Sequence, residues 1–239
     1  MNIALIGYGK MGKIIEQIAL GRGHQVPLKI DLNNLDECTT DNLRTCDVAI
    51  EFTGPHSAFD NVMKGLKAGI PVVCGSTGWL EKYSEVTDFC QQADGSFLYA
   101  SNFSIGVNIF FELNRVLAEM MANQNGYDVR MTEIHHTQKK DAPSGTAITL
   151  AEQILEKITR KTKWVNEASS DADALFIESI REDPAPGTHT IVYDSAVDSI
   201  EIRHTAHNRN GFATGAVLAA EFLNGKKGVY SMKDVLSIR

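Results

Sequence analysis

The chain has 239 residues, of which 43% are apolar and 22% are charged, and its formal net charge is −7. This length and composition suit two small globular domains, each large enough to bury a core. The negative charge argues against nucleic acid as a general partner, because proteins that bind phosphate backbones usually carry a basic surface. The sequence shows no apolar run of membrane-spanning length and no leader peptide pattern. We therefore expect a cytoplasmic protein without a membrane partner.

The four cysteines predict buried thiols rather than a disulfide or a metal site. They are Cys38, Cys46, Cys74 and Cys90. None forms a CxxC pair or another spacing typical of zinc ligands. In a reducing compartment such residues serve as small apolar core residues, so we predict no bound metal.

The first hundred residues alternate between short apolar strands and helices. Strands are predicted at residues 2–6, 26–30, 48–52, 72–74 and 97–100, and helices from the turn at 7–12 to about 20, at 57–68 and at 80–92. Strands that alternate with helices predict a parallel sheet with right-handed crossovers.

The pattern then changes. Helices are predicted at residues 107–121, from Pro143 through 147–158, and at 215–223; strands are predicted at 129–134, 175–180, 190–193 and 197–202, the last three antiparallel. Residues 160–171 form a polar stretch, and the tail at 228–239 is expected to pack back on the first domain.

We therefore predict an α/β protein with a Rossmann-type, doubly wound parallel sheet. Residues 1–104 and 209–239 would form this dinucleotide-binding domain. Residues 105–208 would form an inserted α+β domain with an open mixed or antiparallel sheet.

A GxGxxG motif at Gly7, Gly9 and Gly12 follows the first strand and opens a helix. Glycine permits the tight turn, lets a pyrophosphate approach the backbone and lets helix and strand pack closely. The helix N-terminus then presents free N–H groups to the phosphates. Asp31 stands nineteen residues beyond Gly12, as this fingerprint requires. A purely structural glycine turn is the alternative.

Asp31 favours NADH, because a carboxylate accepts both ribose hydroxyls and repels a 2′-phosphate. No arginine follows it; the next residues are Leu32 and Asn33. Lys10 or Lys13 could compensate a phosphate, so NADPH stays open.

Two loops leave the predicted sheet at strand ends, at residues 52–55 and 75–78. Because ligands of doubly wound sheets bind beyond the carboxyl ends of the strands, both loops should line the nicotinamide half of a groove. Two ordinary Gly/Pro turns are the alternative.

The densest polar cluster lies at residues 133–146. On an extended strand His135 and His136 point to opposite faces, so only one aims squarely at a given point. A turn could return the Lys139 ammonium to that point, and the predicted helix N-terminus at 144–146 suits a carboxylate. Together these groups would receive an acidic substrate and donate a proton. A solvated basic loop before a capped helix is the alternative.

A second basic cluster stands at the return to the first domain: Arg203, His204, His207 and Arg209. Its location at a domain junction, where pockets often form, raises the chance of a binding role.

Seven stretches resemble the family of 4-hydroxy-tetrahydrodipicolinate reductases, also called dihydrodipicolinate reductases. They are GxGxMG at 7–12, FTxP at 52–55, GSTG at 75–78, SNFSIGVN at 101–108, EIHHTQKKDAPSGTA at 133–147, HTAHNRNGFATGA at 204–216 and GVYSMKDVL at 228–236. The resemblance runs almost from end to end, and the stretch at 133–147 is the most specific.

The resemblance implies reduction of a cyclic imine dicarboxylate on the pathway to diaminopimelate and lysine. A hydride would pass from the nicotinamide to ring C4, with loss of the 4-hydroxyl as water. His135 would be the acid–base group, and Lys139 the proton donor or charge stabiliser. The implied substrate-binding residues are His136, Ser144, Gly145 and Thr146. The family is typically a homotetramer assembled through the sheet of the second domain.

The predicted cofactor site combines the glycine motif with positions that match the family. It comprises Gly7, Gly9, Lys10, Met11, Gly12, Asp31, Phe52, Thr53, Gly75, Ser76, Thr77, Ala100, Ser101, Asn102, Phe103, Arg209 and Phe212.

The chain also departs from the family pattern. Ser76 stands where threonine is common, and the segments after Asp31 and at 160–172 are short, so a lid or dimer contact of longer relatives would be reduced here. Residues 101–105 are the predicted hinge for closure around both ligands. Two other functions stay open: a reductase of another imine or keto acid, and a non-catalytic NAD-binding redox sensor.

Overall fold

The computed structural model describes residues 1–238 and divides into two compact units. The first unit comprises Met1–Ile105 and the chain from Asn210 on, and the second unit is Gly106–Arg209. These bounds lie within one residue of the expected ones. No helix among the described residues is long and apolar enough to cross a membrane.

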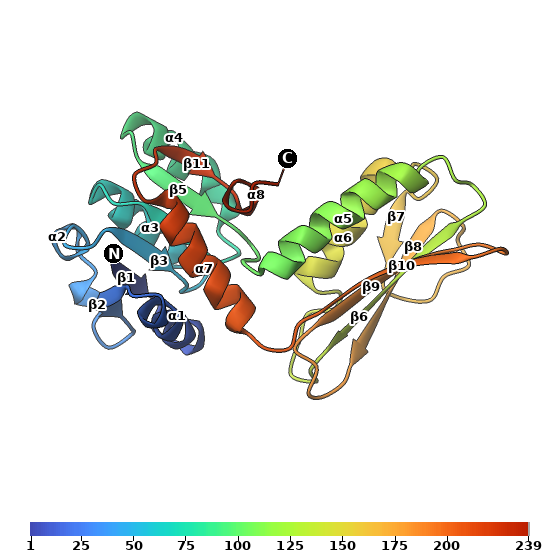
Figure 1. The fold of residues 1–239 in the computed structure, drawn as a ribbon, viewed down its shortest axis with the longest axis horizontal. Coiled ribbons are helices and arrows are strands. Elements are labelled where there is room, and N and C mark those ends of the chain that lie inside the picture. The colour runs from blue at the N-terminus through green and yellow to red at the C-terminus, as the bar shows by residue number, and fades with distance from the viewer. Residues whose placement is uncertain (239) are drawn as a thin grey trace. The chain divides into compact units, whose positions relative to one another are not determined.

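The first unit contains a six-stranded sheet in which every neighbouring pair is parallel (Figure 1). Its strand order is β11-β5-β4-β3-β1-β2. The strands are β1 (Asn2–Ile6), β2 (Gln25–Ile30), β3 (Val48–Glu51), β4 (Val72–Cys74), β5 (Ser96–Tyr99) and β11 (Gly228–Tyr230). The predicted Rossmann-type sheet is confirmed, and the described part of the tail packs back on it as the strand β11 beside β5.

Helices cover both faces of this sheet because its strands are apolar on both faces. Ile3 and Leu5 contribute to the core beneath α1 (Lys10–Gly21) and α7 (Asn210–Leu223). Ala4 and Ile6 contribute to the opposite core, which contains residues of α3 and α4. The other helices are α2 (Thr40–Leu43), α3 (Ala58–Lys67), α4 (Tyr83–Gln92) and α8 (Met232–Val235), with 3₁₀ turns at Leu35–Glu37 and Leu80–Lys82.

Two helices differ from the predictions by more than two residues or in kind. The segment predicted as one helix at 80–92 divides into a 3₁₀ turn and α4. Helix α7 begins at Asn210, five residues before the predicted start. Its first turn contains polar residues and glycine, which weaken the helical pattern in the sequence.

The second unit contains a five-stranded mixed sheet in the order β10-β9-β6-β8-β7. The strands are β6 (Asp128–His135), β7 (Lys163–Val165), β8 (Ala174–Arg181), β9 (Thr188–Asp194) and β10 (Ser199–Thr205). Helices α5 (Ile105–Met121) and α6 (Gly145–Lys157) supply residues to the core on one face of this sheet. On β6 the residues that enter this core, such as Val129 and Met131, are buried, whereas Arg130 between them is exposed.

The predicted antiparallel arrangement of the last three strands is correct for β9 and β10 and wrong for β8. Strand β8 pairs in parallel with β6 and with β7, and β6 separates it from β9. Residue pattern alone does not choose a strand's neighbours, because it reports only which face is buried. Strand β7 was missed, since it is three residues long and lies in the polar stretch.

All four cysteines are free and buried, as predicted. Burial raises the pKa of the Cys38, Cys46 and Cys90 thiols. They therefore act as small apolar side chains in one core of the first unit, the one that contains residues of α3 and α4.

We expect Gly215→Ala to destabilise the first unit. A Cβ at Gly215 would lie 1.7 Å from the Phe103 carbonyl oxygen, so α7 would have to move outward. The free energy of unfolding should fall by roughly 1–3 kcal/mol, the usual cost of overpacking. Urea unfolding followed by Trp79 fluorescence in a Trp164→Phe background measures this unit.

Gly21→Ala is the matched control, because Gly21 is also a helical glycine, at the last residue of α1, and a Cβ there would meet nothing within 4 Å. It should leave stability unchanged or raise it by up to about 1 kcal/mol. Equal unfolding midpoints for the two variants would contradict the close packing of α7.

Candidate active site

The glycine motif makes a turn that other residues could not occupy. Gly7 has φ +101°, and a Cβ there would lie 2.3 Å from the Phe52 carbonyl oxygen. A Cβ at Gly12 would lie 2.5 Å from the Gly7 carbonyl oxygen. At Gly9 a Cβ would meet nothing within 4 Å, so space is open beside the turn. The first and third glycines therefore allow close packing, and the second faces open space where a ligand can approach.

Helix α1 begins behind this turn with a free N-terminus. Gly9 is its N-cap, no side chain caps it, and its first turn holds no acidic residue. Its N–H groups and partial positive charge are thus available to an anion such as a pyrophosphate.

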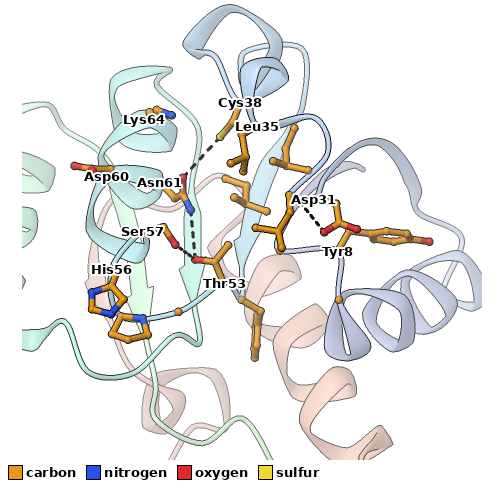
Figure 2. Close-up of a pocket in the computed structure, with 18 residues that line it drawn as sticks. Tyr8, Asp31, Leu35, Cys38, Thr53, His56, Ser57, Asp60, Asn61 and Lys64 are labelled. Carbon is orange, nitrogen blue, oxygen red and sulfur yellow. Dashed lines mark hydrogen bonds between the residues drawn. The ribbon is translucent and has the colours of Figure 1, made fainter.

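A cavity of about 550 Å³ lies beside this turn, beyond the ends of β1, β2 and β3 (Figure 2). Five predicted cofactor residues line it: Gly7, Gly9, Asp31, Phe52 and Thr53. The predicted residues Lys10, Met11 and Gly12 belong to the first turn of α1 and do not line it. A cavity of this size accommodates part of a dinucleotide.

Asp31 follows β2 directly and lines the cavity. Its Oδ1 accepts a hydrogen bond from the Leu32 N–H at 2.7 Å, and its own N–H donates to Asn34 Oδ1 at 2.7 Å. These contacts fix the carboxylate at the rim of the cavity, where it can meet a ribose.

A buried carboxylate that the sequence analysis missed supports the loop after β3. Glu51 is fully buried and accepts hydrogen bonds from the Thr53 N–H at 2.9 Å and from the Thr53 hydroxyl. The Cys74 thiol donates to its other oxygen at 3.1 Å. Thr53 in turn accepts from the Ser57 hydroxyl at 2.9 Å (Figure 2). Glu51 therefore holds in place Thr53, which lines the cavity.

The second predicted loop packs against Phe52 rather than lining the cavity. A Cβ at Gly75 would lie 2.3 Å from the Phe52 ring, so only glycine fits there. The Ser76 hydroxyl is buried and has no hydrogen-bond partner among the described residues. The Phe52 and Phe103 rings lie 5.5 Å apart. Besides Lys10, Met11 and Gly12, the predicted residues outside the cavity lining are Gly75, Ser76, Thr77, Ala100, Ser101, Asn102, Phe103, Arg209 and Phe212.

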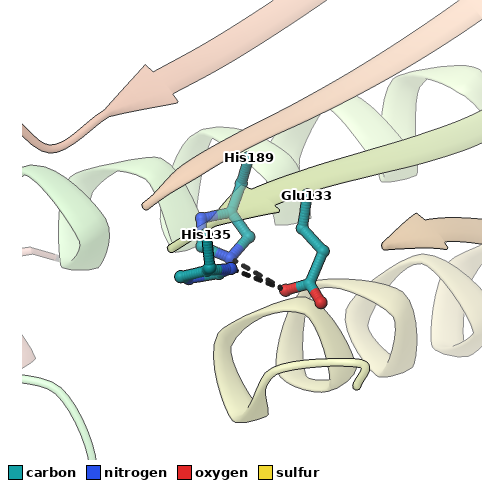
Figure 3. A group of neighbouring side chains, drawn as sticks. All are labelled: Glu133, His135 and His189. Carbon is teal, nitrogen blue, oxygen red and sulfur yellow. Dashed lines mark ion pairs between the residues drawn. The ribbon is translucent and has the colours of Figure 1, made fainter. Parts of the chain in front are cut away.

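The second unit contains a buried polar cluster formed by Glu133, His135 and His189 (Figure 3). Glu133 Oε2 lies 3.4 Å from His135 Nδ1 and 3.7 Å from His189 Nε2. The two imidazole rings meet edge to face at 5.2 Å. Glu133 and His135 stand two residues apart on β6, so both point to the helix-covered face of the sheet.

The N-terminus of α6 joins this cluster through Ser144. The Ser144 N–H donates to both Glu133 oxygens, at 3.0 and 3.1 Å. Its hydroxyl accepts from the Ala147 N–H at 3.2 Å as the helix cap and lies 3.2 Å from His189 Nε2. The predicted helix N-terminus at Ser144, Gly145 and Thr146 is therefore present, and it is fastened to the sheet.

Two cations lie at the edge of the cluster. Arg181 Nη2 donates to Glu133 Oε1 at 3.2 Å and to the Asp141 carbonyl oxygen at 2.6 Å. The Lys139 ammonium contacts both Asp141 carboxylate oxygens at 2.9 Å. The predicted turn is present, since the Lys139 N–H donates to the His136 carbonyl at 3.1 Å. The sequence did not predict Arg181 as a site residue, because the pairing of its strand, β8, with β6 was not predicted.

The cluster holds an anionic Glu133 beside neutral imidazoles. Burial opposes ionisation of Glu133, but hydrogen bonds from Ser144 and Ser179 outweigh it and lower its pKa. Burial lowers the pKa of His135 despite the raising effect of Glu133, and Lys139 and Arg181 lower it further. Burial, together with His135, lowers the pKa of His189 to about 4.

The same three side chains could in principle hold a metal ion, since their ligand atoms lie within 4.8 Å of one another. Arg181 already compensates the charge of Glu133 at 3.2 Å, and its guanidinium would repel a dication. We therefore keep the prediction that this site works without a metal.

A doubly wound parallel sheet, a glycine turn with a free helix N-terminus and a carboxylate after β2 define a nicotinamide-dependent oxidoreductase. Residues 1–103 match the family described as dihydrodipicolinate reductase, N-terminus, and residues 106–236 match dihydrodipicolinate reductase, C-terminus. The chain therefore belongs to the dihydrodipicolinate reductase family.

Individual relatives agree with the family match. The chain is 51% identical over 240 residues to a 4-hydroxy-tetrahydrodipicolinate reductase of Christiangramia forsetii, covering 99% of this chain and 98% of the relative. It is 33% identical over 265 residues to that of Methanosarcina barkeri, with both chains fully covered. A solved dihydrodipicolinate reductase from Paenisporosarcina sp. TG-14, with bound dipicolinate, matches the whole fold with a TM-score of 0.81 at 22% identity.

We expect the second unit to lose stability as the pH falls from about 6.5 to about 4. His189 has a folded pKa of about 4 and an ordinary value of 6.5. Between these pH values His189 is protonated in the unfolded chain but not in the folded chain. The free energy of unfolding therefore falls as the pH falls. The contribution lost is on the order of 3 kcal/mol.

Urea unfolding at several pH values, followed by Trp164 fluorescence in a Trp79→Phe background, measures this slope. In His189→Gln, which cannot be protonated here, the dependence between these pH values should flatten. An equal slope in the variant and its parent would contradict the buried neutral state of His189.

Proposed function

We propose that this chain reduces 4-hydroxy-tetrahydrodipicolinate with a nicotinamide cofactor, in the cytoplasm, on the route to diaminopimelate and lysine. NADH is favoured over NADPH. The observation that carries the proposal is the network of His135, Glu133 and the α6 N-terminus, in a chain of this reductase family. It combines an imidazole for proton transfer with N–H groups for a carboxylate, the two needs of a dicarboxylate substrate that is protonated as it is reduced.

The first unit would hold the cofactor. The free N-terminus of α1 would bind the pyrophosphate, and Asp31 the adenosine ribose. The open space at Gly9 and the partnerless Ser76 hydroxyl support this assignment. When bound, the nicotinamide supplies the hydride. We assign its remaining contacts to Thr77, Ala100, Ser101, Asn102, Phe103, Arg209 and Phe212, together with the loop residues that support them.

The second unit would hold the substrate. Ser144, Gly145 and Thr146 would present N–H groups and hydroxyls to one carboxylate, with His136 as a further contact. His135 would exchange the proton. Lys139 would donate a proton or stabilise negative charge, for which it leaves Asp141, its partner at 2.9 Å.

We also propose a homotetramer assembled through the sheet of the second unit. The face of this sheet opposite α5 and α6 presents half-buried apolar side chains, including Ile134, Ile180 and Val192. Closure of the two units around both ligands, with a hinge at residues 101–105, completes the proposal.

Lys139→Ala should lower kcat by roughly 10²- to 10⁴-fold, the usual worth of acid–base assistance, while NADH affinity stays unchanged. The assay supplies the condensation product of pyruvate and aspartate semialdehyde and follows NADH absorbance. Lys140→Ala is the control, since Lys140 is the exposed neighbour in the same loop. Wild-type turnover by Lys139→Ala would remove this residue from the mechanism. No oxidation of either NADH or NADPH by the wild type would defeat the proposed function and favour a redox sensor.

Asp31→Asn should shift cofactor use toward NADPH. Loss of the carboxylate removes one close repulsion of a 2′-phosphate, so the ratio of kcat/KM for NADPH to that for NADH should rise roughly tenfold or more. Asp36→Asn is the control, because Asp36 is exposed nearby and does not line the cavity. An unchanged ratio in Asp31→Asn would show that other residues choose between the nucleotides.

A further inference from the structure

Glu133 is a fully buried carboxylate in a site expected to bind a dianion, which calls for a physical reason. Three donors compensate it: the Ser144 N–H, the Ser179 hydroxyl at 2.8 Å and Arg181 at 3.2 Å. These donors occupy Oε1 fully, whereas Oε2 has only the Ser144 N–H at 3.1 Å and otherwise faces the two imidazoles. Removing an ionised carboxylate from water costs free energy, so a functional reason for its burial is expected.

The sheet places this carboxylate in a polar row that crosses three strands. Glu133 of β6 stands opposite His189 of β9 and opposite Ser179 of β8. The next buried positions along β6, Met131 and Val129, belong to the apolar core. The row therefore ends the core at the edge where α6 begins, and Glu133 lies at its centre.

The two nitrogens of His135 lie in different surroundings. Nδ1 is fully buried and makes no hydrogen bond with a described residue; the Glu133 carboxylate is its charged neighbour, with Oε2 at 3.4 Å. The side chain keeps 10% exposure, which Nδ1 does not supply. On the other edge of the ring, Nε2 lies beside Gly187, where an added Cβ would be 3.1 Å away. Because residue 187 is glycine, no side chain from this position covers Nε2. Since Nδ1 is buried and the ring keeps some exposure, we take Nε2 as the nitrogen placed to exchange a proton with a ligand.

We propose that Glu133 is a positioning residue: its carboxylate holds the Nδ1–H form of His135, leaving Nε2 to the substrate, and fixes the α6 N-terminus that receives the substrate carboxylate. The inference rests on the proposed function. The buried charge of Glu133 thereby fixes the position of His135, the proton-transfer group, relative to the α6 N-terminus, which receives the substrate carboxylate. The carboxylate does not touch the substrate; it acts through His135 and Ser144.

Glu133→Gln tests the tautomer with almost no change of shape. An amide nitrogen at the Oε1 position would face both Arg181 and the Ser144 N–H, neither of which can accept a hydrogen bond. At the Oε2 position it would also meet the Ser144 N–H, but it would face two imidazole nitrogens that can accept. The amide nitrogen therefore turns to the Oε2 position and donates to His135 Nδ1, which forces the proton to Nε2. A wrong tautomer in a carboxylate–imidazole pair costs about 10⁴ in kcat in serine proteases, so we expect kcat/KM to fall by about 10²- to 10⁴-fold.

Three readouts separate positioning from a merely structural role. Neutron diffraction of the wild type above pH 7 should show deuterium on His135 Nδ1 and none on Nε2, and the reverse in Glu133→Gln. The limb of the pH profile of kcat/KM that belongs to His135 should move to lower pH in Glu133→Gln, because the negative charge that favours the imidazolium is gone. Glu133→Asp, which keeps the charge, should recover at least about tenfold of the lost kcat/KM.

Glu152→Gln is the matched control, since it removes an exposed carboxylate from α6 and should change kcat/KM by less than about threefold. NADH affinity should be equal in all variants. Deuterium on Nε2 in the wild type, or near-wild-type activity in Glu133→Gln, would overturn the inference. The wild-type neutron measurement needs neither turnover nor a folded variant. Failure of the proposed function would appear separately, as absence of oxidation of both NADH and NADPH by the wild type.

Discussion

Burial of an ionised carboxylate constrains the second unit more than any other interaction. Glu133 has no access to water, so every donor around it must hold its place. The Ser144 N–H fixes the start of α6 against β6, and Arg181 ties the end of β8 to the loop at Asp141. Helix α6, the strands β6 and β8 and the loop at Asp141 are thus all connected through the Glu133 carboxylate. The positions of the two imidazole rings depend on this arrangement.

The first unit also contains a buried glutamate that accepts hydrogen bonds from a loop. Glu51 is also fully buried, and it accepts from Thr53 and Cys74 at the end of a parallel strand. In both units an acid beneath a loop holds backbone N–H groups of that loop in place. A loop fixed from below can present its outer surface to a ligand without rearranging first, which lowers the entropic cost of binding.

The sequence predicts the first unit well because buried parallel strands and their helices leave strong local patterns. The glycine motif and Asp31 also carry their own context, namely a strand before and a helix after. The neighbours of β8 could not be predicted, because pairing depends on how α6 returns the chain and not on the strand's own residues.

The sequence did not predict a structural role for Glu133 or Glu51, because a glutamate in a strand normally points to solvent. A signal was nevertheless available for Glu133. It shares its alternation with Val129 and Met131, which places it on the core-facing side of β6. His189 has the corresponding position on β9, so a search for ionisable residues in core register would have found both.

The pairing of β11 with β5 and the packing of α7 on β1 and β3 have a consequence for biosynthesis. During translation the first hundred residues leave the ribosome with one side of their sheet only partly covered, because α1 packs there early but α7 begins only at Asn210. The inserted unit is complete before that cover arrives and can fold on its own core. The apolar sheet surface that α7 covers therefore stays exposed on the nascent chain until the inserted unit has been made and α7 follows it.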